Sequence, residues 1–462
     1  MVKFPTRFDE LLPPAAVSRV LDLLSQPNLS STVREALNKV GLKDANPVGQ
    51  IQEAWRQARG WVESVAQQVL HQTEASPAVI NATGRLFDAR WSSLPCDSVV
   101  VQSMAAAAVS FQDQNLLEKY AERTAVESTG AQAAATACSI SALCGAFLSS
   151  KCAAGGIVIS RSDIVRLPGS IDLRHLLSGL TRVTEVGAVN GAGADEWKQA
   201  LISDSQLVVL VSPNNLTSEE AGEQRTAALA AARSKGCKVV EILFDAVLDE
   251  QKSLFEVWIA SGIEPYPVRI DLVLCPLDHL IGGPTGAVAV GRAEMVTAIR
   301  DKIHEQGLKL CGPSAAGAAV ALGTKSDTSA ASSVMRMLLT NEENLKDRAR
   351  RIALQLNNST YIETAEAVTS ENRLGPSPWT QYRLIGHAVS LVPRGGDAAA
   401  LQSLLASGKL GPAIWSNVEN NRVMFELRWV DPADDHLIVS SLAETKPETE
   451  PDQADAKAEA NT

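Results

Sequence analysis

The sequence predicts an α/β fold built on a mainly parallel sheet. Between residues 157 and 244, short runs of apolar and β-branched residues alternate with stretches that have helical spacing. The runs are nearly continuous in apolar and β-branched residues, which is typical of parallel strands covered by helices on both faces. Strands are expected at 157–160, 183–186, 207–211 and 239–244, and helices between them at 171–178, 194–201 and 218–234.

The composition is that of an ordinary globular protein with more than one domain. The chain has 462 residues, 45% of them hydrophobic and 21% charged, and this length allows two or three domains. No apolar run reaches the roughly 20 residues that span a bilayer, and the first residues lack the apolar stretch of a signal peptide. Seven cysteines without framework spacing favour a cytoplasmic location, and the lack of a CxxC motif argues against zinc.

The charge balance argues against nucleic acid as a ligand. The formal net charge is -11, and the acidic tail 443–462 contributes six acidic and two basic side chains. Residues 1–75 hold eight basic and eight acidic side chains, so they offer no net positive charge. Binding of DNA or RNA depends on neutralising phosphates, so we expect no DNA partner, and the balance disfavours tRNA.

The ends of the chain differ from its centre. Residues 1–76 are expected to form an N-terminal helical region, because apolar residues recur at helical spacing from 17 to 24 and again after Asn46-Pro47. A large α/β domain is expected at 77–325. The tail 443–462 is rich in Pro, Glu and Ala without periodicity, so we expect it to be disordered.

A small α+β domain is expected at 326–442, after a polar hinge. Residues 343–356 have the pattern of a helix whose basic side chains, Lys346, Arg348, Arg350 and Arg351, are expected to face solvent. Two alternating runs within 411–428 flank Glu419-Asn420-Asn421, which predicts a β-hairpin.

The stretch 271–291 places two polar residues at a strand end. Two β-branched runs are joined through a turn that includes Gly282-Gly283-Pro284-Thr285-Gly286, and Asp278 and His279 follow the first run. Ligands of open α/β sheets bind beyond strand ends, so both are candidate site residues. An imidazole with an unperturbed pKa near 6.5 is suited to moving protons at neutral pH.

Several motifs resemble bacterial selenocysteine synthase (L-seryl-tRNA(Sec) selenium transferase), a fold type I family that uses pyridoxal phosphate (PLP). In chain order they are Ile80-Asn81-Ala82-Thr83-Gly84, Ser128-Thr129-Gly130-Ala131, the corner 280–284 and Leu427-Arg428. The resemblance covers residues 78–442. It implies a fold type I PLP-transferase-like large domain with a mainly parallel sheet, an N-terminal helical region and a small α+β C-terminal domain.

The sequence departs from the family's pattern at the site itself. In the family, an Asp-Lys pair precedes Leu-Leu-Gly-Gly-Pro and the lysine holds PLP as a Schiff base, whereas Asp278 and His279 stand there in this chain. Ser139 and Ser141 stand where the family has an asparagine cluster, at a helix N-terminus that binds the cofactor phosphate, and their hydroxyls are candidate donors to that phosphate. The segment 308–314 replaces a family segment rich in arginine and lysine. An imidazole cannot form the imine.

The position that faces the pyridine nitrogen of PLP stays open. The family's aspartate keeps that nitrogen protonated, which makes the ring an electron sink. Counted back from His279 without gaps, the position falls on Ile242, whereas a loop three residues shorter puts Asp245 there. The resemblance also places Asn214 and Gly283 among the cofactor-binding positions.

Three functions fit this pattern, and we favour the first. The chain is a catalytically impaired homologue that acts as a binding or regulatory subunit. Alternatively, it is a PLP or pyridoxamine phosphate enzyme in which His279 is the base and no Schiff-base lysine is used. The third function is the family's own, selenium transfer to L-seryl-tRNA(Sec).

The resemblance also bears on cofactor and assembly. We expect no cofactor, or non-covalent pyridoxal or pyridoxamine phosphate. Fold type I sites are completed by a second subunit, so the resemblance implies a homodimer or higher oligomer, with an active paralogue as another possible partner and no membrane attachment.

Overall fold

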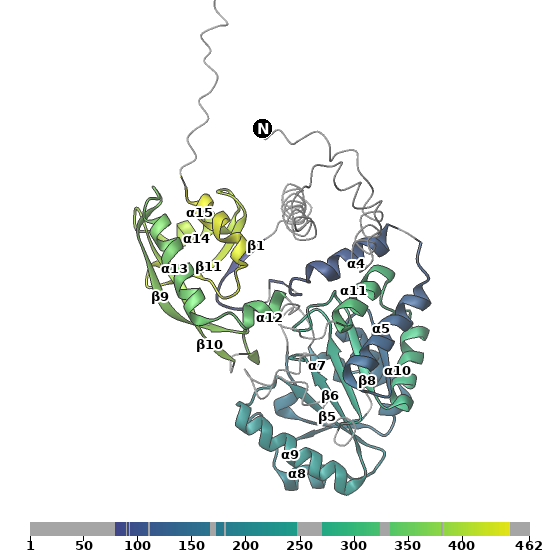
Figure 1. Ribbon diagram of the computed structural model, residues 1–462. Helices are drawn as coiled ribbons and strands as arrows, with labels where there is room; N and C mark the ends of the chain where they lie inside the picture. The colour runs from purple at the N-terminus through teal and green to yellow at the C-terminus, as the bar shows by residue number, and fades with distance from the viewer. Residues whose placement is uncertain are drawn as a thin grey trace, which may run out of the picture. The chain divides into compact units, whose positions relative to one another are not determined.

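The computed structural model describes residues 79–443, apart from 89, 92, 110, 167–171, 180–181, 247–269, 324–332 and 380–381 (Figure 1). The helical region expected at 1–76 and the disordered tail expected after 443 therefore lie outside the described residues, as do the hinge residues 324–329.

A seven-stranded sheet is the centre of the larger domain. Its strand order is β2-β8-β7-β6-β5-β3-β4, and the neighbours from β7 through β4 are parallel, while β8 is antiparallel to both β7 and β2. The predicted mainly parallel sheet is confirmed. The strands are β2 Ala133–Ala137, β3 Ile157–Ser160, β4 Val183–Val186, β5 Leu207–Ser212, β6 Lys238–Leu243, β7 Leu272–Pro276 and β8 Ala287–Gly291.

Helices cover both faces of this sheet, as its apolar strands require. Alternate strand residues point to opposite sides, so Ile157 and Val158 belong to two different core clusters. One cluster includes α6 Ile140–Ser149, α7 Leu173–Leu177 and α10 Ala293–Glu305. The other includes α4 Ser98–Ala108, α5 Gln114–Thr129, α8 Ala194–Ala200, α9 Ser218–Lys235 and α11 Gly312–Gly323.

A five-stranded sheet forms the smaller domain, in the order β1-β11-β12-β10-β9. Its strands are β1 Val79–Ala82, β9 Ile362–Arg373, β10 Arg383–Pro393, β11 Ala413–Glu419 and β12 Arg422–Glu426. Helices α13 Glu342–Leu356, α14 Ala398–Ala406 and α15 Asp435–Ser441 share its core (Figure 1). The hairpin between β11 and β12 turns at Asn420 and Asn421, whose φ angles of 49° and 58° are those that a two-residue hairpin turn needs.

Two expectations differ from the structure. Strand β1 lies in the small sheet, parallel to β11, although the sequence analysis assigned residues 77–325 to the large domain. Arg348 does not face solvent: it is buried, and its guanidinium lies 2.6 Å from Asp435 and donates to the carbonyls of Leu427 and Val430. The ion pair and these bonds replace water around the charge, which permits its burial.

Candidate functional site

The carboxyl ends of β5, β6 and β7 meet at one edge of the large sheet. Because these three strands are parallel neighbours, residues that follow them gather at the same edge, where open α/β sheets bind ligands. Ser212 is the last residue of β5, Asp245 comes two residues after β6, and His279 comes three residues after β7. The sequence analysis named the last two of these.

Asp245 is a buried carboxyl held by two hydroxyl groups. Its Oδ2 accepts a hydrogen bond from Ser212 Oγ at 2.7 Å and another from Tyr382 OH at 2.9 Å. Burial raises the pKa of Asp245 to about 6, and the two hydroxyl bonds oppose that rise. Ile242, the other residue considered for this position, lies within β6 and packs in the apolar core.

His279 is enclosed by aromatic rings. Its ring lies edge-on to Phe87 with centroids 4.9 Å apart and to Trp379 at 6.3 Å, while Phe244 is 6.1 Å away. Phe87 and Trp379 stack on each other at 4.3 Å. We call Phe87, Phe244, His279, Trp379 and Tyr382 the aromatic cluster, and each of its members is at most 6% exposed.

The enclosure of His279 makes it a weak base. Burial lowers the pKa of His279 to about 4, although a hydrogen bond with the backbone of Phe244 acts in the opposite direction. Within the described residues, its Nδ1 has no hydrogen-bond partner. The imidazole is therefore uncharged near neutral pH.

The neighbours of His279 hold the turn in place. Asp278 is buried, and burial raises the pKa of Asp278 to about 6 while a hydrogen bond from Thr285 opposes the rise. The Asp278 carbonyl accepts the backbone N–H of Leu94 at 3.0 Å. A Cβ on Gly283 would lie 3.1 Å from the carbonyl oxygen of Leu277, so tight packing of the turn suffices to explain this glycine.

The other candidates lie on neighbouring loops. Ser139 is the N-cap of α6, and its Oγ accepts the backbone N–H of Ala142 at 3.1 Å. Ser141 is half-buried in the first turn of that helix. Asn214 is turned toward a buried carboxyl: its Nδ2 donates to Asp163 Oδ1 at 2.9 Å, so its amide holds the loop after β5.

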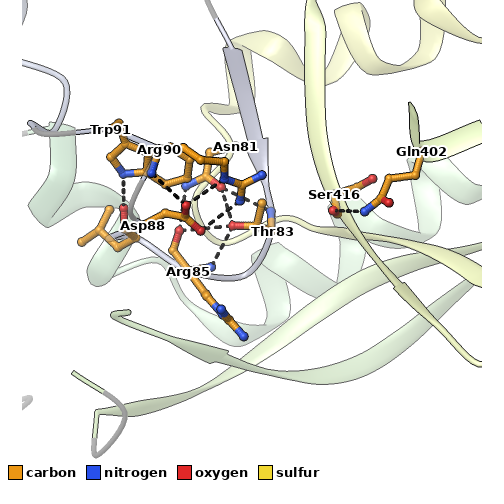
Figure 2. A network of polar contacts seen from close by, with 9 residues as sticks. Asn81, Thr83, Arg85, Asp88, Arg90, Trp91, Gln402 and Ser416 are labelled. Atoms are coloured by element: carbon orange, nitrogen blue, oxygen red, sulfur yellow. Dashed lines mark hydrogen bonds and ion pairs between the residues drawn. The ribbon is translucent and has the colours of Figure 1, made fainter. Parts of the chain in front are cut away.

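Polar contacts fix the segment between β1 and α4 (Figure 2). This segment carries Phe87, which contacts His279. The guanidinium of Arg90 forms two hydrogen bonds with Asp88 and lies over the ring of Trp415 at 4.3 Å. The indole of Trp91 donates to the carbonyl of Leu86 at 2.8 Å. The backbone N–H of Phe87 donates to the carbonyl of Leu374, which ties this segment to the loop that carries Trp379.

Sequence reasoning missed Phe87, Trp379 and Tyr382 as site residues. Trp379 and Tyr382 follow β9 and lie 100 or more residues after His279, in a loop without periodicity. The one available signal was a large aromatic residue directly after Pro376-Ser377-Pro378, because such residues in loops are seldom left exposed.

The described residues hold neither a membrane-spanning helix nor a metal-binding cluster. None of the helices that the structure describes is long and apolar enough to cross a membrane. No group of three or more His, Cys, Asp or Glu side chains in the described part of the chain is arranged to hold a metal ion.

Known proteins resemble this chain across both domains. The model of the L-seryl-tRNA selenium transferase family matches residues 113–431. The L-seryl-tRNA(Sec) selenium transferase of Desulfotalea psychrophila is 25% identical over 334 residues, 70% of each chain. That of Hyphomonas neptunium is 23% identical and covers 91% of this chain and 94% of its own. The structure of D-glucosaminate-6-phosphate ammonia-lyase matches with a TM-score of 0.55 at 15% identity, over 80% of this chain and 96% of that one.

The structural match is evidence for the fold, and the family model is evidence for the family. The structural likeness concerns the fold alone, because proteins of one fold perform many reactions. The family model, however, covers more than half of the chain. This protein therefore belongs to the L-seryl-tRNA selenium transferase family, with the fold of the type I PLP-dependent transferases.

Proposed function

We propose that this chain is a catalytically impaired member of its family and acts as a binding or regulatory subunit. The observation that carries the proposal is the environment of His279. The resemblance puts this residue where the family has its PLP lysine, and here it is a buried, uncharged imidazole inside the aromatic cluster.

Covalent capture of PLP needs a primary amine at this position, since only an amine condenses with the aldehyde to an imine. An imidazole has no such nitrogen. Selenium transfer to a seryl-tRNA, the activity in the names of the relatives, relies in this family on that imine chemistry. The substitution of the lysine therefore weighs against transfer, whatever else the pocket retains.

The remaining site residues fit the cofactor poorly. A pyridinium nitrogen would need a carboxylate oxygen of Asp245, but Oδ2 already accepts two hydroxyl groups, from Ser212 and Tyr382. Asp245 is also only 2% exposed. Both features support a carboxyl whose Oδ2 is already engaged within the chain.

The alternative is an enzyme that binds pyridoxamine phosphate non-covalently and uses His279 as its base. The position of Asp245 at the end of β6 favours this alternative, because a carboxyl there suits a pyridine nitrogen. A general base works best when its pKa is near the operating pH and when it reaches the substrate. His279 is 4% exposed and its pKa is lowered to about 4, so we rank this alternative second.

Cofactor binding separates these functions. The purified full chain is mixed with PLP, reduced with borohydride and digested, and phosphopyridoxyl-lysine is mapped by mass spectrometry. Pyridoxamine phosphate binding is measured in parallel by equilibrium dialysis. A matched variant, Trp379→Ala, removes the ring that closes over His279. We expect the wild type to show no stoichiometric adduct at any single lysine and no saturable binding of pyridoxamine phosphate.

Each contrary result has a clear meaning. One lysine modified in every molecule, with a reducible band at roughly 420 nm, would show an intact covalent site and end the proposal. Saturable pyridoxamine phosphate binding that Trp379→Ala alters would replace it with the second function. Binding that appears only in Trp379→Ala would support the proposal, because it would show that the aromatic cluster closes the site.

A further inference from the structure

Three arginine side chains stand side by side on one face of the five-stranded sheet of the smaller domain. Arg373 ends β9 and lies directly opposite Arg383, the first residue of β10. On its other side, Arg373 pairs with Arg85 in a parallel bridge. Residues paired in this way share a face of the sheet, and their Cα atoms lie about 5 Å apart. We call Arg85, Arg373 and Arg383 the arginine row.

One carboxylate serves the three guanidinium groups of the row. Glu371 accepts two hydrogen bonds from Arg373, at 3.0 and 2.8 Å, and one from Arg383 at 3.3 Å. Within the described residues, the guanidinium of exposed Arg85 donates no hydrogen bond, and Figure 2 shows this side chain extending away from the network around it. The row and Glu371 together hold three positive charges and one negative charge, which leaves a net charge of +2.

The stability of the folded chain does not explain this arrangement. Like charges that lie directly opposite each other in a sheet are destabilising, and both neighbouring pairs within the row have this geometry. The side chains of Arg373 and Arg383 are 38% and 61% exposed, so water and salt screen the repulsion without removing it. The chain as a whole carries a net charge of -11, so the row is a local exception. An anion bound across the three guanidinium groups would relieve the repulsion.

We propose that the arginine row binds the phosphate group of a small organic phosphate monoester. Such a group carries about 1.5 to 2 negative charges at pH 7 and presents three acceptor oxygens, which matches the net charge of the site and its three guanidinium forks. A carboxylate or a phosphodiester brings only one negative charge. Ile385 follows Arg383 by two residues, so it lies on the same face, and its 58% exposed side chain offers an apolar contact to the carbon atoms of the ester.

The row is built on the segments that carry the aromatic cluster. Tyr382 directly precedes Arg383, Phe87 follows Arg85 by two residues, and the loop after β9 carries Trp379. A phosphate that holds the three arginines together would therefore also hold these rings in place around the candidate site. The row lies on other elements than the N-terminus of α6, where the resemblance puts the phosphate of the cofactor. The inference does not rest on the proposed function, because it needs no statement about the cofactor.

Calorimetric titration of the full chain with phenyl phosphate tests the proposal. Arg373→Gln removes the central guanidinium, and we expect it to raise the dissociation constant about 10-fold or more, because a charge-assisted bond to the phosphate is lost. The matched control is Arg422→Gln. Arg422 lies on β12 of the same sheet, is 39% exposed and pairs with Glu366 at 3.2 Å, but the residue opposite it is Glu419 and not an arginine. We expect the control to bind phenyl phosphate as the wild type does.

A second variant has an expected effect of opposite sign, which a folding defect cannot imitate. Glu371→Gln removes the carboxylate that competes with the ligand for Arg373 and Arg383 and nearly preserves the shape of the side chain. We expect phenyl phosphate to bind this variant about fivefold more tightly than the wild type. Benzoate, which carries one charge on a similar ring, should bind the wild type more weakly than phenyl phosphate does.

The contrary outcomes are equally definite. A wild type that shows no saturable binding of phenyl phosphate at millimolar concentrations overturns the proposal. Binding that Arg373→Gln and Arg383→Gln both leave unchanged overturns it as well, because the phosphate then lies elsewhere, as does weaker binding by Glu371→Gln. A single-stranded oligonucleotide that needs Arg373 and that phenyl phosphate does not displace would assign the row to phosphodiesters instead. Equal melting temperatures of the variants check that each one is folded.

Discussion

The hydrogen bond between Tyr382 and Asp245 should stabilise the protein more at high pH than at low pH. Tyr382→Phe removes the hydroxyl and nearly preserves the shape of the ring. Burial raises the pKa of Asp245 from 3.8 to about 6, so the folded protein binds the proton more tightly than the unfolded chain does. Stability then falls as pH rises from about 4 through 6, and the charged, buried carboxylate costs about 3 kcal/mol above that range.

The hydroxyl of Tyr382 reduces that cost by donating to the carboxylate. A hydrogen bond to a charged group contributes about 1.5–3 kcal/mol, and one between neutral groups about 1 kcal/mol. Loss of the hydroxyl should therefore destabilise the protein by about 2 kcal/mol at pH 8, where Asp245 is charged. At pH 5, where it is mostly protonated, the loss should be about 1 kcal/mol.

Urea unfolding at both pH values measures these differences. Other buried carboxyls, such as Asp163 with a pKa of about 7, change the stability of the wild type and the variant alike and cancel in the comparison. Asp245→Asn and the double variant complete a cycle, in which the pH dependence of the Tyr382 effect should vanish once the carboxyl is gone. A Tyr382→Phe effect that is equal at both pH values, or larger at pH 5, would refute the reasoning.

Two further predictions concern the smaller domain. Arg428 is buried and donates to the carbonyls of Leu338, Thr340 and Ile385, so Arg428→Met should cost about 3 kcal/mol in urea unfolding, and a cost below about 1 kcal/mol would contradict this role. Asn420 has a φ of 49° in the hairpin turn, so Asn420→Ala should lower stability by about 1 kcal/mol while Asn420→Gly changes it little; equal effects of the two would show that backbone strain is not the cause.

Periodicity in the sequence predicts most of the strands and helices of the large domain. The strands at 157–160 and 183–186 have the bounds that the pattern of apolar and β-branched residues predicts. Arg348 shows where a pattern was available but misapplied. It lies three residues after Leu345 and four before Ile352, both buried, so helical spacing already puts it on the inner face of α13.

The candidate site was harder to predict than the fold, because it depends on loop lengths and on contacts between residues far apart in the sequence. Whether Asp245 or Ile242 takes the position of the family's aspartate depends on the loop length between β6 and β7, which counting from His279 cannot supply. In the structure β6 stops at Leu243, so Ile242 lies within the strand and Asp245 follows its end. Tyr382 contacts Asp245 across 137 positions of sequence. No local pattern encodes such a contact, because it follows from how the small sheet approaches the strand ends of the large one.

The residues around His279 and Asp245 share one physical role, which is to fill space and to satisfy buried polar groups. A site that loses its cofactor is left with an empty volume and with polar groups that have no partner, and both destabilise a buried region by several kcal/mol. Here the stacked pair Phe87 and Trp379 fills space beside His279, and Ser212 and Tyr382 satisfy Asp245. An imidazole becomes uncharged on burial at a smaller cost than a lysine, whose unperturbed pKa is about 10.4. Under the proposed function, His279 in place of a lysine is what lets the aromatic cluster pack around an uncharged ring. Under the same proposal, an opening that admits a substrate would have to separate Phe87 from Trp379 and break the hydrogen bonds of Asp245 with Ser212 and Tyr382.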